Sequence, residues 1–74
     1  MARLRPLPFR EVKRKLEAAG FIEASQRGSH IKFVRSTQEG TRVAIVPHHP
    51  EVRPGTLRSI VNQAGLTPEE FDHL

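Results

Sequence analysis

Two glycine-containing turns lie close together in the middle of the chain and restrict its fold more than any other feature. Residues 26–28 (Gln-Arg-Gly) and 37–40 (Thr-Gln-Glu-Gly) separate three short segments of β character, residues 21–24, 29–35 and 42–46. Connections this short suit hairpins, whereas parallel strands need a crossover of a dozen or more residues. The sequence therefore predicts an antiparallel three-stranded meander.

Stretches with helical periodicity lie on both sides of this meander. Residues 8–19, and residues from Pro54 to just before Gly65, repeat apolar side chains at intervals of three and four, which is typical of amphipathic helices. Residues 67–70 (Thr-Pro-Glu-Glu) have the capping-box pattern, which predicts one further helical turn. The apolar side chains of the two stripes are Phe9, Val12, Leu16, Ala19, Leu57, Ile60, Val61 and Ala64.

The predicted order is thus α-β-β-β-α, an α+β fold in which both helix stripes need an apolar surface. The simplest packing places both helices on one face of the sheet. Because side chains alternate along a strand, we expect one set to face the helices and the other to remain on an open face. The first set is Ile31, Phe33, Val43 and Ile45, and the second is His30, Lys32 and Arg42.

Composition limits the classes of protein to consider. Residues 1–74 are short enough for one domain, and the absence of cysteine excludes disulfides and thiolate metal sites. The longest aliphatic run, residues 43–46, cannot span a membrane, and no leader pattern opens the chain, so we expect a cytoplasmic protein. All 12 Lys and Arg residues lie between Arg3 and Arg58, which predicts a polyanionic partner, with ordinary solvated surface charge as the alternative.

His30 is the strongest candidate for chemistry, because the strand pattern exposes it beside Lys32. In RNA cleavage the substrate's own 2′-hydroxyl is the nucleophile, so a single imidazole can carry the proton transfer while cations hold the phosphate. A surface histidine without a function is the alternative. Gly28 and Ser29 serve the preceding turn, or allow the RNA backbone to approach.

A second candidate stretch is the loop at residues 46–57. It carries His48 and His49, but adjacent side chains in an extended chain point apart and no cysteine or suitable carboxylate completes a zinc site. All four Phe fall on predicted core positions, so recognition through the RNA backbone is expected rather than base stacking. The predicted RNA contacts are Arg27, Gly28, Ser29, Lys32, Arg42, His48, Arg53 and Arg58.

Three stretches, "FREVKRKLEAAGF", "GSHIKF" and "VPHHPEVRPGTLRSIVNQAGL", resemble the HicA family of bacterial toxins over residues 8–72. The resemblance implies an mRNA interferase with a fold like the double-stranded-RNA-binding domain, neutralised by a HicB-type antitoxin that covers the active site. It implies that His30, in the Gly-Ser-His motif, is catalytic without a metal or cofactor. Many members carry a second histidine where this chain has Ile31, so the general acid is left open between Lys32, His48 and water.

Two further hypotheses remain from the sequence alone. The same basic face could bind RNA without cleaving it, in which case replacing His30 would leave binding unchanged. Alternatively, the exposed sheet could dock a protein partner, and the chain would then show no salt-dependent affinity for RNA.

Overall fold

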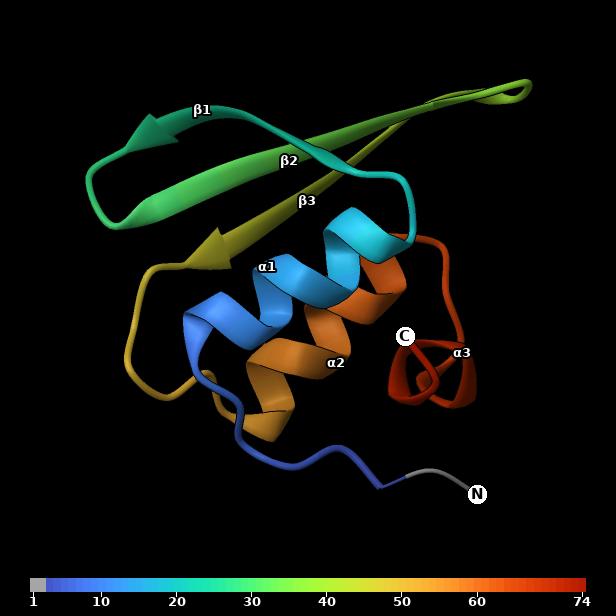
Figure 1. The fold of residues 1–74 in the computed structure, drawn as a ribbon. Coiled ribbons are helices and arrows are strands. Elements are labelled where there is room, and N and C mark those ends of the chain that lie inside the picture. Colours follow the sequence, from blue (N-terminus) through green and yellow to red (C-terminus); the bar gives the residue numbers. More distant parts are fainter. Residues whose placement is uncertain (1–2) are drawn as a thin grey trace.

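A three-stranded antiparallel sheet covered on one face by helices forms the fold (Figure 1). The structure is a computed structural model and describes residues 3–74. Its element order confirms the α-β-β-β-α prediction and the fold class of the double-stranded-RNA-binding domain, with a short helix added at the end. The elements are α1 (Phe9–Ala18), β1 (Ile22–Arg27), β2 (His30–Thr37), β3 (Gly40–Pro47), α2 (Pro54–Gln63) and α3 (Pro68–Asp72).

The helices begin and end close to where the sequence predicts. Gly65, with φ of +74°, follows α2 in the left-handed conformation, and the Leu66 amide donates to the Val61 carbonyl at 3.1 Å. α3 begins with the predicted capping box: the Glu70 amide donates to Thr67 Oγ1, and the Thr67 amide donates to Glu70 Oε1. These bonds satisfy backbone groups that helix ends otherwise leave without partners.

The strands are longer than predicted, and the turns between them are correspondingly shorter. β1 runs to Arg27 and pairs there with His30, so that only Gly28 and Ser29 form the turn. β2 and β3 likewise close at the pair of Thr37 and Gly40. The register of β1 shifts by one residue between Glu23 and Ser25, as a β-bulge does.

The face of β3 is opposite to the one predicted. Ala44 and Val46 are fully buried under the helices, whereas Val43 and Ile45 remain 37% and 38% exposed on the open face. Cross-strand pairing explains the choice: Ala44 lies opposite the bulky ring of Phe33 on β2. The small side chain leaves room for that ring against the helices, where a larger one would overfill the core.

The same reversal moves Arg42 away from the predicted site. Arg42 pairs with Arg35 on the helix-facing side, and a Cβ added at Gly65 would stand 2.7 Å from Arg42 Cζ. The guanidinium therefore lies beside the C-terminal end of α2, where the negative pole of the helix dipole favours a cation. The prediction that Arg42 shares the open face with His30 is wrong.

An apolar strip crosses the open face, defined by Ile22, Val34, Val43 and Ile45. Ile22 pairs with Val34, and Val34 with Val43, so that these three side chains are cross-strand neighbours on one face. Ile22 is 65% exposed. Helices cover the other face of the sheet, and no element of residues 3–74 covers this one (Figure 1).

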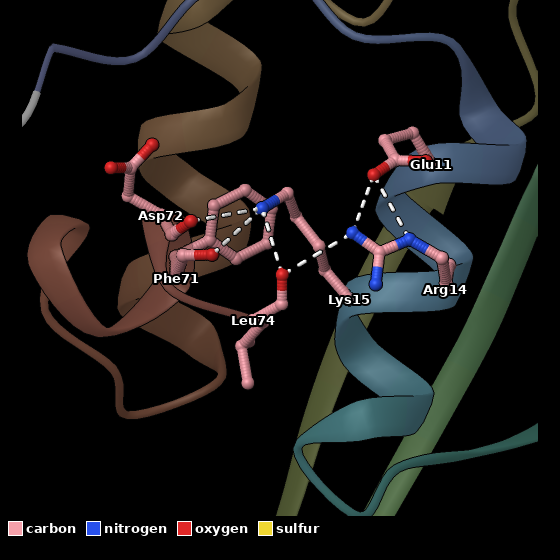
Figure 2. Close-up of polar contacts among 6 residues, drawn as sticks. All are labelled: Glu11, Arg14, Lys15, Phe71, Asp72 and Leu74. Carbon is pink, nitrogen blue, oxygen red and sulfur yellow. Dashed lines mark hydrogen bonds and ion pairs between the residues drawn. The ribbon is translucent and has the colours of Figure 1, made fainter.

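A buried lysine joins α1 to α3 (Figure 2). Lys15 Nζ donates to the backbone carbonyls of Phe71 at 3.1 Å, Asp72 at 3.3 Å and Leu74 at 3.4 Å, and lies 5.3 Å from the centre of the Phe71 ring. The ammonium thus adds a donor to the carbonyls at the C-terminal end of the short helix α3, where the helix itself supplies few.

Arg14 adds an exposed contact beside this lysine (Figure 2). Its guanidinium donates to the Leu74 carbonyl and to the Glu11 carboxylate. The hydrogen bond from Arg14 lowers the pKa of Glu11 below its usual value. The C-terminal residues are therefore held by two neighbouring cations of α1.

Candidate active site on the open face of the sheet

His30 is the first residue of β2, directly after the two-residue turn. Gly28 has φ of +59°, which favours glycine, and the Gln26 side-chain amide donates to the Gly28 carbonyl at 3.0 Å. The Ser29 carbonyl accepts from the His48 amide at 2.6 Å. The turn is thus held on both sides, and it presents an exposed imidazole on a fixed backbone.

The first of two hollows around His30 gathers positive charge, and we call it the cationic hollow. Arg27 pairs with His30 and Ser25 pairs with Lys32, so all four side chains emerge on the open face. The hollow has a volume of about 570 Å³. Its lining residues are Ser25, Gln26, Arg27, His30, Lys32 and Ile45.

The second hollow follows the free edge of β3, and we call it the edge hollow. Its volume is about 490 Å³, and it lies between the end of β3, the following loop and α2. Gln63 Oε1 accepts from the Ile45 amide at 2.9 Å, which fastens α2 to this edge. The lining residues are His30, Ile45, Pro47, His49, Gly55, Thr56, Ser59, Ile60 and Gln63.

His30 and Ile45 line both hollows, so the imidazole stands where they meet. The sequence pattern had singled out His30, Arg27 and Lys32, and the structure brings these three together. It had not singled out Thr56, Ser59 or Gln63 as site residues. Their side chains follow α2 at positions that only the packing of that helix against β3 reveals.

The other predicted contacts lie elsewhere. The His48 ring packs on Phe9, with ring centres 4.3 Å apart, and lines a different hollow together with Pro50. Arg58 lines a separate hollow on α2 with Asn62, and Arg53 is the exposed residue that precedes α2. The structure thus gives His48 a packing contact, and RNA contacts by His48 and by the two arginines stay predictions.

Residues 3–74 contain neither a cluster of metal ligands nor a membrane-spanning helix. Within that range, no group of three histidine, cysteine or acidic side chains is arranged to hold a metal ion. No helix in the same range is long and apolar enough to cross a bilayer.

Comparison with known proteins settles the family. A family model described as "HicA toxin of bacterial toxin-antitoxin" matches residues 9–66, which include α1, the whole sheet and α2. The chain belongs to the HicA toxin family. No curated protein matches the sequence.

Membership has direct consequences for this chain. A HicA protein is the toxin of a bacterial toxin–antitoxin system, so an antitoxin is its partner. Toxins of the HicA family are generally ribonucleases. The matched range contains every residue that lines the two hollows, whereas α3 lies beyond it.

Proposed function

We propose that this HicA protein is an endoribonuclease that cleaves mRNA in the cytoplasm with His30 as its catalytic residue. The observation that carries the proposal is the position of His30. An exposed imidazole stands at the meeting point of two hollows, with the cations Arg27 and Lys32 on the same open face. An RNA strand lying across this face brings a phosphodiester next to all three groups.

The reaction follows from these groups and from the substrate. The 2′-oxygen forms a bond to phosphorus, the bond from phosphorus to the 5′-oxygen breaks, and the products are a 2′,3′-cyclic phosphate and a 5′-hydroxyl. His30 accepts the proton of the 2′-hydroxyl as general base, the role that histidine fills most often among side chains. Arg27 and Lys32 stabilise the charge on the phosphoryl oxygens. Because the RNA supplies its own nucleophile, this scheme requires no metal-activated water.

Recognition in this proposal relies on the RNA backbone. Phe21, Phe33 and Phe71 are buried, and the partly buried Phe9 ring packs on His48 and Phe33, so the open face has no stacking platform. Contacts to phosphate and ribose are the expected alternative. Binding should then weaken steeply with salt, as it does for proteins that replace counterions on phosphates.

The apolar strip supports a HicB-type antitoxin as the partner that covers this site. Large apolar side chains in mutual contact on an open face mark a protein interface more often than isolated exposed ones. The strip is continuous with the site, because Ile45 belongs to both the strip and the two hollows. An antitoxin that buries Ile22, Val43 and Ile45 would therefore also cover His30.

Cleavage of a labelled RNA in the presence of EDTA tests the nuclease proposal. His30→Ala should abolish cleavage and leave RNA binding intact, while His73→Ala should cleave like the wild type. His73 is a suitable control because its ring contacts the Glu69 carbonyl on α3, outside both hollows.

Each alternative outcome has a distinct meaning. Salt-dependent RNA binding without cleavage by the wild type would identify a non-catalytic RNA-binding module. Neither cleavage nor binding would identify the open face as a protein-docking surface only. Undiminished cleavage by His30→Ala would refute the role of the imidazole.

A further inference from the structure

Two adjacent histidines that look equivalent in the sequence have different surroundings in the structure. The His48 amide donates to the Ser29 carbonyl, and its ring lies on Phe9. Both residues are exposed and both line the hollow beside Phe9, but of the two it is His49 that also lines the edge hollow together with His30. One imidazole is thus part of the packing, and the other is available to a ligand in the hollow.

The backbone of His49 is held in place on both sides. Its amide donates to the Pro47 carbonyl at 2.9 Å, and its carbonyl accepts from the Phe9 amide at 3.2 Å. The second bond ties this loop to the start of α1. The imidazole therefore projects from a fixed segment, which is what a group that must meet a substrate in one geometry needs.

The edge hollow has the size and lining that a nucleotide unit requires. Its volume of about 490 Å³ lies within the usual range of ligand sites. His30 enters from the start of β2 and His49 from the loop after β3, while the hydroxyls of Thr56 and Ser59 come from α2. Two imidazoles from different segments thus line one space.

We infer that His49 is the general acid of the cleavage reaction, an inference that rests on the proposed nuclease function. As the bond from phosphorus to the 5′-oxygen breaks, the His49 imidazolium gives its proton to that oxygen. In the same step His30 takes the proton of the 2′-hydroxyl. One proton enters the enzyme and one leaves it, and the products are the same cyclic phosphate and 5′-hydroxyl.

The two other side chains considered for this role fit it less well. Lys32 lines the cationic hollow, where its charge is placed to hold phosphoryl oxygens. His48 lines neither hollow that contains His30. His49 alone of these three shares the edge hollow with the proposed base.

An RNA oligonucleotide in which sulfur replaces the bridging 5′-oxygen of one linkage tests this assignment. A thiolate leaves without being protonated, so such a substrate does not need a general acid. His49→Gln should cleave ordinary RNA about 10²- to 10⁴-fold more slowly than the wild type, the usual contribution of acid–base catalysis. The same variant should cleave the sulfur-containing linkage at nearly the wild-type rate.

Two matched variants complete the experiment. His30→Ala should be defective on both substrates, because the base is needed whichever atom leaves. His73→Gln should cleave ordinary RNA within a few-fold of the wild type, because its ring lies on the Glu69 carbonyl, outside both hollows.

Three results would overturn the inference. If His49→Gln is equally slow on both substrates, His49 has a structural role only. If His49→Gln cleaves ordinary RNA as fast as the wild type, His49 has no role in the chemistry. A wild-type protein that cleaves neither substrate refutes the proposed function, and this inference with it. Thermal melts of each variant separate loss of folding from loss of chemistry.

Discussion

The buried ammonium of Lys15 provides the sharpest test of how this small domain is stabilised. We consider Lys15→Met, which keeps an unbranched side chain of similar length next to the Phe71 ring and removes only the charge. The carbonyls of Phe71, Asp72 and Leu74 then lose the ammonium as a donor, while Phe71 keeps the Leu74 amide and Leu74 keeps the Arg14 guanidinium. Any loss of stability therefore reports these hydrogen bonds rather than a cavity.

The size of the effect follows from the contacts. A hydrogen bond to a charged group contributes ~1.5–3 kcal/mol, but the three bonds share one ammonium. Their surroundings range from buried at Phe71 to partly buried at Leu74, where water replaces part of the loss. We therefore expect a decrease of about 2 kcal/mol in the free energy of unfolding, which corresponds to a Tm lower by about 8–16 °C in a domain of this size.

Urea titration and thermal melts followed by circular dichroism measure this decrease. Lys13→Met is the matched control on the same helix, because Lys13 Nζ lies 3.2 Å from Glu23 Oε1 with both side chains about 40% exposed. An exposed pair of this kind contributes less than about 1 kcal/mol. Equal effects of the two substitutions, or a Lys15→Met protein as stable as the wild type, would refute this account of Lys15.

Three further predictions concern β3 and the helix ends, and urea titration checks each. Val46→Ala should lower the free energy of unfolding by about 2 kcal/mol, because the side chain is fully buried. Ile45→Ala should lower it by less than half as much, because this side chain is partly exposed. The reverse order of the two effects would contradict the observed face of β3. Gly65→Ala should cost about 1 kcal/mol through its positive φ, and adding Arg42→Ala should not restore stability, because the guanidinium is free to move aside. Thr67→Ala should cost about 1 kcal/mol by removing the side-chain cap of α3, and an unchanged midpoint would show that this cap contributes nothing.

The helices and the strand order could be predicted because their sequence patterns have a single interpretation. The apolar stripes within residues 8–19 and 54–64 fit only the helical period, and the two turns leave no length for a crossover. The two faces of β2 could also be predicted, because Ile31 and Phe33 alternate with the polar His30 and Lys32. The position of His30 on the open face follows directly from that alternation.

The face of β3 could not be predicted from its own residues. Val43 and Ile45 form one alternating set, Ala44 and Val46 form the other, and both sets are apolar. The sequence pattern predicts that Val43 and Ile45 face the core. The ring of Phe33 lies opposite Ala44 on the neighbouring strand, and this pairing places Ala44 and Val46 in the core instead. That information lies in the pairing of two strands and not in either one alone.

The candidate site shows the same limit. Adjacent imidazoles such as those of His48 and His49 cannot be told apart by composition or spacing, because each differs only in what folds against it. Phe9, far away in the sequence, packs on the ring of His48, whereas His49 is the one of the two that lines the edge hollow. The contribution of α2 to the edge hollow depends likewise on the bond between Gln63 and the Ile45 amide.

The shared position of Ile45 has a consequence for how the toxin is controlled. This side chain belongs to the apolar strip and also to the walls of both hollows. A protein seated on the strip and a nucleotide seated in the hollows would need the same space, so occupancy by one must displace the other. Inhibition of this kind is competitive: it depends on the ratio of inhibitor to transcript, and enough RNA would overcome it without any change in the shape of the toxin.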